Sequence, residues 1–149
     1  MKKARSRLLI RSLARTEIPD MVKVWRASGL QYKLNGRDSL KNLAIQYNND
    51  PELFLGAFRS GRMVGVLLAS DDGRRAWINR LAVVPEAQRQ GVALALVNRA
   101  ERLLRTRGRR LFCVQIDEGN GISMKLFERA GYRREHEIFY FTKRERKSY

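Results

Sequence analysis

The sequence predicts an α/β domain of the α+β kind, in which helices pack on the faces of a mixed sheet. Of its 149 residues, 44% are hydrophobic, and strand-like and helix-like patterns alternate along the chain. A chain of this length buries roughly 68–70% of its unfolded surface, enough for a real core. No apolar run approaches the ~20 residues that span a bilayer. We therefore expect one domain over residues 1–149, with its core at about 8–142, basic termini and no membrane contact.

The first third of the chain predicts a strand and two helices. Residues 8–13 are mostly apolar, as in a strand. Thr16 suits a helix N-cap, after which Ile18, Met21, Val22 and Trp25 recur at helical spacing, and Gly29 suits the end of this helix. Asp38 or Ser39 suits the N-cap of a second helix, which ends at residues 48–51. The apolar face of this helix carries Leu40, Leu43, Ala44 and Tyr47.

Three strands are predicted next, at residues 53–58, 63–69 and 76–84. The short separators between them, RSGR and DDGR, are hairpin-type turns, so the three strands should run antiparallel. The third strand is apolar on both faces except for Asn79 and Arg80, which places it inside the sheet.

The remaining pattern alternates again. A polar, glycine-containing loop at residues 88–93 precedes an apolar helical face at 93–104. A strand at 111–116, a short helix at 120–131 and a final strand at 137–142 complete the order β-α-α-β-β-β-α-β-α-β.

Charge and rare residues limit the function classes. The net charge of +16 favours an anionic partner, such as nucleic acid, an acidic protein or a phosphorylated cofactor, although a solvated basic surface would look the same. A single Cys and a single His exclude an internal disulfide and argue against a metal site, so we expect none. The apolar run near the N-terminus is too short for a signal peptide, which predicts a cytoplasmic protein. The basic clusters include Lys2, Lys3, Arg5, Arg7, Arg11 and Arg15, then Arg99, Arg102, Arg105 and Arg109, and finally Lys143, Arg144, Arg146 and Lys147.

The loop before the third helix has the chemistry of an anion site. Free N–H groups at a helix start, together with the helix dipole, attract negative charge. Gly91 allows close approach of the backbone to a ligand, and Arg89 adds a positive charge. The pattern GxxxxGK[ST] is absent, which disfavours nucleotide hydrolysis. A diphosphate would suit this loop. The alternative is that the loop only connects the strand to the helix and binds no ligand.

Two motifs resemble the GNAT superfamily of N-acetyltransferases. The letters QRQGVA at residues 88–93 resemble the family's Q/R-x-x-G-x-G/A loop, with Ala93 in place of the last glycine. The letters NGISMKLFERAGY at residues 120–132 resemble its N-x-x-A-x-x-L-Y-x-x-x-G-F motif. One helix and one strand separate the motifs, as in the family, and the element order matches over about residues 8–142.

The resemblance implies a mixed, mostly antiparallel sheet of about six to seven strands, splayed at its centre and flanked by about four helices. Acetyl-coenzyme A would lie in the splay as co-substrate, its pantetheine arm pairing with the strand backbone and its pyrophosphate on the loop amides. The residues so implied are Leu81, Ala82 and Val83 on the strand, Gln88, Arg89, Gln90, Gly91, Val92, Ala93 and Leu94 at the loop and helix start, and Asn120, Ser123 and Phe127 along the cofactor arm.

The catalytic residues are less apparent. The family often carries a tyrosine at the position of Phe127, whose hydroxyl protonates the departing thiolate, and phenylalanine cannot donate. A dedicated acid contributes roughly 10²–10⁴-fold. Tyr132 is a candidate replacement, and Asn79 could orient a water in place of a general base, although packing and surface roles are the simpler interpretations. A backbone N–H near residues 81–83 would supply the oxyanion donor.

Taken together, the sequence predicts an acetyl-coenzyme A-dependent N-acetyltransferase in which a primary amine attacks the thioester directly in a ternary complex. The alternatives are an acyl-coenzyme A-binding module with weak or lost catalysis, or a basic nucleic-acid-binding domain. The expected acceptor is an amine of a small molecule or of a protein. A homodimer and a nucleic-acid or acidic partner are further expectations.

Overall fold

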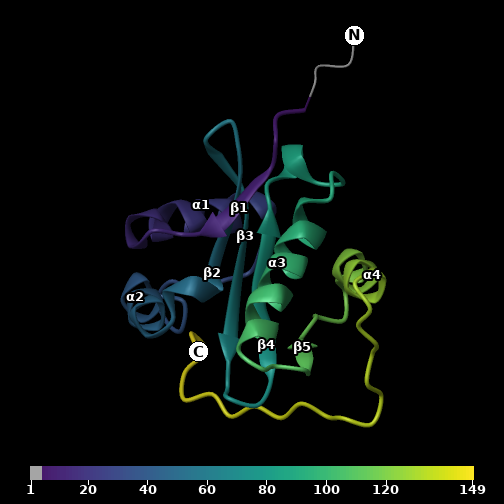
Figure 1. Ribbon diagram of the computed structural model, residues 1–149. Helices are drawn as coiled ribbons and strands as arrows, with labels where there is room; N and C mark the ends of the chain where they lie inside the picture. The colour runs from purple at the N-terminus through teal and green to yellow at the C-terminus, as the bar shows by residue number, and fades with distance from the viewer. Residues whose placement is uncertain (1–4) are drawn as a thin grey trace.

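The strands form one sheet in the order β1-β2-β3-β4-β5 (Figure 1). The computed structural model describes residues 5–149, so Lys2 and Lys3 of the predicted basic clusters lie outside the described residues. The first four strands pair antiparallel, which confirms the two predicted hairpins, and β5 pairs with β4 in parallel. The strands span Leu9–Ser12 (β1), Phe54–Arg59 (β2), Arg62–Asp71 (β3), Ala76–Val83 (β4) and Phe112–Val114 (β5).

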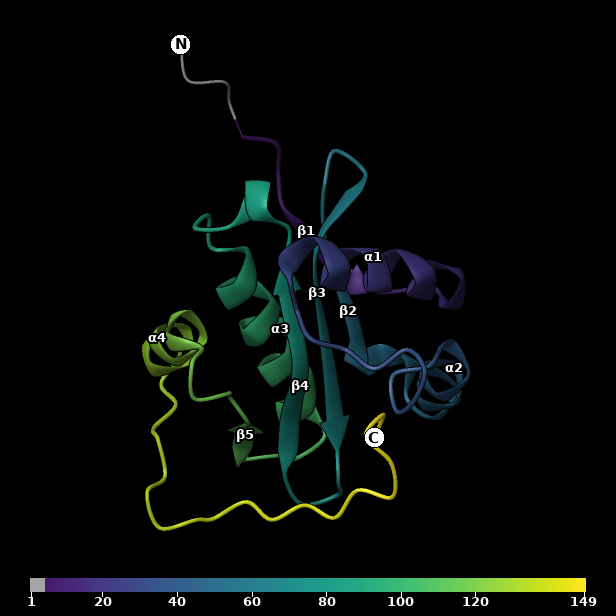
Figure 2. The ribbon, with the colours of Figure 1, turned by 180° about the vertical axis from the view of Figure 1, so that it is seen from behind.

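The predicted helices form on both faces of the sheet. Helix α3 covers the face turned to the viewer in Figure 1, and α1 crosses the opposite face, seen in Figure 2. Ser39 caps α2 by accepting a hydrogen bond from the Asn42 amide at 3.2 Å, whereas Asp38 pairs with Arg80. The N-cap of α1 is Glu17 and not the predicted Thr16, which lies in a 3-10 turn. Within residues 5–149, no helix is both long and apolar enough to span a membrane. The helices span Ile18–Ser28 (α1), Leu40–Asn49 (α2), Val92–Thr106 (α3) and Gly121–Arg129 (α4), with single 3-10 turns at Arg15–Glu17, Pro51–Leu53 and Pro85–Ala87.

The core lies between the sheet and the helices on each face. Trp25 of α1 and Phe54 of β2 are fully buried, as are Leu96 and Leu104 of α3. Helix α3 approaches β3 closely at Gly65, where an added Cβ would lie 3.0 Å from a Val92 methyl. The missing side chain at this position therefore sets how near the start of α3 lies to the sheet.

An ion-pair network joins the end of α3 to the distant segments beside it. Arg107 donates to Asp50 at 2.6 and 2.8 Å and to Glu52 at 2.8 Å. Arg109 donates to Asp71, the last residue of β3, at 2.6 Å. Burial opposes the charged form of Asp71, yet the bonds from Arg109 and from the Gly73 amide outweigh it and hold the pKa of Asp71 below its usual range. These pairs fix the turn after α3, from which β5 begins.

The predicted arginine face of α3 is therefore only partly free. Arg105 pairs with Glu101 at 3.0 Å, and its guanidinium lies 4.9 Å from the centre of the Phe112 ring. Arg109 is used by the network, while Arg99 and Arg102 are exposed. A surface for an anionic partner would rest on these last two side chains from this helix.

The final predicted strand was wrong. Residues 137–142 form no strand, and the sheet of the described chain has five strands instead of six to seven. Figures 1 and 2 show the segment after α4 passing beneath the ends of β3 and β4 and finishing beside α2. A strand-forming composition needs a neighbouring edge to pair with, and this path leads away from the edge at β5.

Candidate functional site

The sheet opens between β4 and β5 beyond a β-bulge. β4 pairs with β5 only from Ala76 to Ile78. On its other edge β4 pairs with β3, where Ala69 lies opposite Ile78 and Leu68 opposite Arg80, so Asn79 is the extra residue. Bulges bend and twist a strand, and this one lies directly where the β4–β5 pairing stops. The predicted splay is therefore present, and the bulge accounts for it.

The open edge of β4 carries free backbone groups. The amide of Val84 donates to Val64 of β3 at 3.0 Å. Because antiparallel pairing alternates direction along a strand, Leu81 and Val83 direct their backbone groups away from β3, toward the opening. The Val83 carbonyl accepts a bond from Gln88 Nε2 at 3.0 Å. The Leu81 amide and carbonyl thus face the splay without a strand partner in the described chain.

The predicted anion loop ends at an uncapped helix start. Gly91 is the N-cap residue of α3, has a φ of 78° and offers no capping side chain. The first bond inside the helix runs from the Ala95 amide to the Gly91 carbonyl at 3.0 Å, so the amides of residues 92–94 have no partner within α3. Arg89 also has a positive φ of 56°, which costs a non-glycine residue roughly 1–2 kcal/mol. The start of α3 therefore presents amides that have no partner within the helix.

Side chains from the β2–β3 hairpin hold this loop in place. Arg59 at the end of β2 donates to the Gln90 side-chain oxygen, and Gln90 in turn donates to the Glu86 carbonyl at 2.9 Å. Arg62 at the start of β3 donates to the Glu86 carboxylate at 2.5 Å. These contacts tie the conformation of the loop to the hairpin, and we call the Arg59–Gln90 pair the hairpin clamp.

Comparison with known sequences decides the family. A model of the Acetyltransferase (GNAT) family matches residues 12–132. This chain belongs to the GNAT family. The match covers the splayed strands, the loop before α3 and the second motif in α4, so the resemblance seen in the sequence is confirmed.

Solved structures share the GNAT fold at low sequence identity. Ard1 from Thermoplasma volcanium has a TM-score of 0.74 and 20% identity, with 83% of this chain and 81% of that chain covered. The PaiA N-acetyltransferase from Thermoplasma acidophilum, in complex with coenzyme A, has a TM-score of 0.73 and 19% identity, with coverage of 87% and 91%. AAC(6')-Iy, in complex with a bisubstrate analogue of coenzyme A and monomethyl-acetylneamine, has a TM-score of 0.74 and 20% identity, with coverage of 93% and 99%.

The second GNAT motif builds α4. Asn120 is the N-cap, and its side-chain oxygen accepts from the Ser123 amide at 3.2 Å. Ser123 is half-buried, and Phe127 is only 3% exposed. The Phe127 ring meets the Tyr132 ring edge-on, with centroids 5.0 Å apart at 79°. The residue that replaces the family's tyrosine is therefore part of the packing of α4.

The two candidate catalytic residues differ in environment. Asn79, in the bulge, is exposed and donates to the Ser70 hydroxyl at 2.9 Å. The Tyr132 hydroxyl is buried without a hydrogen-bond partner in the described chain. Burial, helped by the nearby Glu101 carboxylate, raises the pKa of Tyr132 far above its usual range. The raised pKa makes Tyr132 a weak acid, so it is a poor replacement for the family's tyrosine, whereas Asn79 is placed to bind a water or a substrate.

One pair beside the bulge was not predicted. Arg80 donates to both Asp38 oxygens, at 3.1 and 3.0 Å, and Asp38 also accepts from the Lys33 amide at 2.7 Å. Asp38 is 8% exposed. This pair joins the α1–α2 loop to β4 next to the opening. A charged residue in an otherwise apolar strand was the available signal, but nothing in the sequence pointed to its partner.

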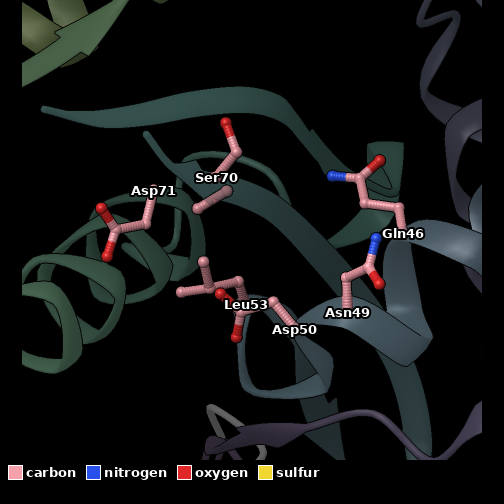
Figure 3. Close-up of a pocket in the computed structure, with 7 residues that line it drawn as sticks. Gln46, Asn49, Asp50, Leu53, Ser70 and Asp71 are labelled. Carbon is pink, nitrogen blue, oxygen red and sulfur yellow. The ribbon is translucent and has the colours of Figure 1, made fainter. Parts of the chain in front are cut away.

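A pocket of about 170 Å³ lies on the α2 side of β3 and borders the bulge through Ser70, the partner of Asn79 (Figure 3). The carboxylates at its wall, Asp50 and Asp71, are already engaged by Arg107 and Arg109. None of the predicted cofactor residues lines it. Its lining residues are Gln46, Asn49, Asp50, Leu53, Ala69, Ser70 and Asp71.

Proposed function

We propose that this GNAT domain transfers an acetyl group from acetyl-coenzyme A to a primary amine. One observation carries the proposal: β4 has no partner on one edge beyond Ile78, and the uncapped start of α3 packs through Val92 on Gly65, which pairs with Val83 of β4. A pantetheine arm has amide groups that can pair with such an edge, and a pyrophosphate suits free amides at a helix N-terminus. Family membership supports the same cofactor.

The chemistry follows from these groups. The neutral amine attacks the thioester carbon, the C–N bond forms, and the carbonyl oxygen becomes an oxyanion. The Leu81 amide, directed into the opening, is our candidate donor to that oxyanion. The intermediate collapses as the C–S bond breaks and the thiolate leaves with the electron pair. Water accepts the proton that the amine nitrogen loses, and water returns one proton to the sulfur.

The acceptor would approach at the bulge. Asn79 is exposed there, and the α1–α2 loop is held over β4 by the Asp38–Arg80 pair. The amine must come within about 3–3.5 Å of the thioester carbon for efficient attack. We infer that the α1–α2 loop selects the acceptor, because it is the segment tied to β4 beside the opening.

A second candidate is a module that binds acyl-coenzyme A with weak or lost catalysis. Phe127 favours it, because a buried phenyl ring cannot protonate a departing thiolate. A third candidate, nucleic-acid binding, rests on the net charge of +16 and on exposed arginines such as Arg99 and Arg102.

Two measurements on the full chain separate these functions. Coenzyme A should raise the melting temperature, with a stabilisation of about 2.7 kcal/mol at a hundredfold excess over Kd. Free thiol released from acetyl-coenzyme A with a panel of primary amines then distinguishes transfer from binding alone. No thermal shift and no titration heat with coenzyme A would overturn the proposal. Nucleic-acid binding that falls steeply with salt would instead favour the third candidate.

A further inference from the structure

The α1–α2 loop folds into a compact turn that fixes the backbone around Arg37. The Lys33 carbonyl accepts hydrogen bonds from the amides of Gly36 and Asp38, at 2.9 and 3.0 Å. The Lys33 amide in turn donates to the Asp38 carboxylate at 2.7 Å, and the Asn42 side chain of α2 donates to the Gly36 carbonyl at 3.0 Å. Arg37 therefore projects from a loop whose conformation is already set, so binding at its side chain does not have to order the loop.

Two guanidinium groups share one carboxylate beside the β-bulge. Arg80 donates to both Asp38 oxygens, at 3.1 and 3.0 Å, and Arg37 Nε lies 3.8 Å from Asp38 Oδ2. A second Arg80 nitrogen donates to the carbonyl of Asn79, the extra residue of the bulge, at 3.4 Å. We call Arg37, Asp38 and Arg80 the bulge cluster. Because arginine stays charged in proteins, two positive charges face one negative charge and the cluster keeps a net positive charge.

Arg37 is the open member of the bulge cluster. Its side chain is 45% exposed, against 20% for Arg80 and 11% for Asp38. Arg37 Nε approaches Asp38 only to ion-pair distance, and within residues 5–149 the Arg37 side chain donates no hydrogen bond. A guanidinium with free N–H groups binds a carboxylate or a phosphate through two parallel hydrogen bonds. The exposed side of the cluster thus has the chemistry of an anion site.

The other carboxylates near the bulge are already paired. Asp50 and Asp71, which line the pocket beside Ser70, accept bonds from Arg107 and Arg109, each at 2.6 Å. An acceptor with a second ammonium group would find no free carboxylate among these residues and would meet the net positive charge of the cluster. An acceptor that carries a negative charge would instead be attracted.

We propose that the bulge cluster binds an anionic group of the acceptor, a carboxylate or a phosphate, through Arg37. The acceptor is then a primary amine that also carries a negative charge, and not a polyamine. This inference rests on the proposed function, because it places the cluster at the acceptor side of the acetyl-transfer site. Arg80 directly precedes Leu81 in β4, so an anion held by the cluster keeps the amine of the same molecule near the candidate oxyanion donor.

Bisubstrate conjugates test the charge preference without requiring catalysis. In each, the sulfur of coenzyme A is joined through an acetyl group to the nitrogen of β-alanine, phosphoethanolamine, β-alaninamide or a diaminopropane, or of their longer homologues. These conjugates end in a carboxylate, a phosphate, a neutral amide and an ammonium group. In isothermal titration calorimetry, we expect the full chain to bind the carboxylate or the phosphate conjugate about tenfold more tightly than the amide conjugate, and the ammonium conjugate most weakly. The tighter anionic conjugate identifies the group.

Variants of Arg37 should change this preference. Arg37→Met should raise the Kd of the anionic conjugates about tenfold and leave that of the amide conjugate unchanged, because only the anion loses its partner. Arg37→Glu should make the ammonium conjugate bind more tightly than the anionic ones. Lys41→Met is the matched control, since it removes the same charge from an exposed side chain of α2 that forms no ion pair in the described chain. Thermal unfolding checks that each variant is folded.

Coenzyme A alone is the reference ligand. If it binds while the anionic and amide conjugates bind equally, or the ammonium conjugate binds most tightly, the anion site is overturned and the proposed function stands. The same holds if Lys41→Met changes the preference as much as Arg37→Met. If coenzyme A itself does not bind, the proposed function is overturned and the anion site with it.

Discussion

The Arg59 guanidinium donates a hydrogen bond to the Gln90 side chain, although the two residues are 31 positions apart. This hydrogen bond joins the end of β2 to the loop before α3. The Gln90 side chain in turn donates a hydrogen bond to the Glu86 carbonyl within the same loop. Neither side chain needs to touch a ligand for this contact to matter. It holds the amides after Gly91 in the conformation that the proposed pyrophosphate site requires.

Loss of the hairpin clamp should weaken coenzyme A binding. We expect Arg59→Met to raise the Kd of coenzyme A by roughly three- to tenfold, which corresponds to the free energy of about one hydrogen bond that orders the loop. Isothermal titration calorimetry measures the Kd of coenzyme A for the wild type and the variant. Arg62→Met is the control: its bond to Glu86 is an exposed ion pair, typically worth about 0–1 kcal/mol, and it should change Kd little. Equal effects of the two variants would count against the clamp.

A side chain at Gly91 should block the cofactor. Gly91 has a φ of 78°, and an added Cβ would meet nothing within 4 Å, so Gly91→Leu leaves the packing intact. We expect a loss of about 1–2 kcal/mol from the left-handed backbone. Coenzyme A binding should fall below detection, because the new side chain would fill the space beside the loop amides.

Gly108 is the matched control for Gly91. It has a φ of 85° and equally open surroundings, but it lies just beyond the other end of α3. Gly108→Leu should lose a similar amount of stability in thermal unfolding and keep its affinity for coenzyme A. Unchanged coenzyme A binding in Gly91→Leu would show that the cofactor does not use this loop.

The Phe127 ring is expected to have a structural role. Adding a hydroxyl by Phe127→Tyr puts a polar group into a side chain that is 3% exposed, at a cost of about 1–3 kcal/mol if it finds no partner. We expect a lower melting temperature and no faster turnover. Phe54→Tyr is the control, since Phe54 also meets a tyrosine edge-on, with centroids 5.2 Å apart. Faster turnover in Phe127→Tyr alone would show that the ring reaches the leaving sulfur.

Acid should destabilise the fold through Asp71. Because its pKa is lowered in the folded state, its contribution is complete above the ordinary value of 3.8 and is lost as the pH falls through the lower folded value. The free energy of unfolding of the wild type should therefore drop more steeply below about pH 4 than that of Asp71→Asn. Asp117→Asn, on an exposed loop, should keep the wild-type slope. Denaturant titrations at several pH values measure the difference.

Sequence patterns located most of the fold and the proposed cofactor loop. The turns after residues 59 and 71 and the glycine before α3 were readable, because turn chemistry and helix starts depend on adjacent residues. The bulge at Asn79 was not readable, since a bulge is a property of the register between two strands. The strand expected at residues 137–142 failed for a related reason: its composition suits a strand, but composition does not supply a neighbouring edge.

By itself, the sequence determined the order of helices and strands as far as α4, the family and the place of the glycine loop, because each depends on residues close together in the chain. The tertiary structure decided that the pairing of β4 with β5 ends at Ile78, and that Arg80 bonds to Asp38, 42 positions away in the sequence. It also left residues 138–141 exposed, away from the edge of the sheet. Such contacts arise only when strand register and helix packing bring distant residues together, and a local sequence pattern does not predict them.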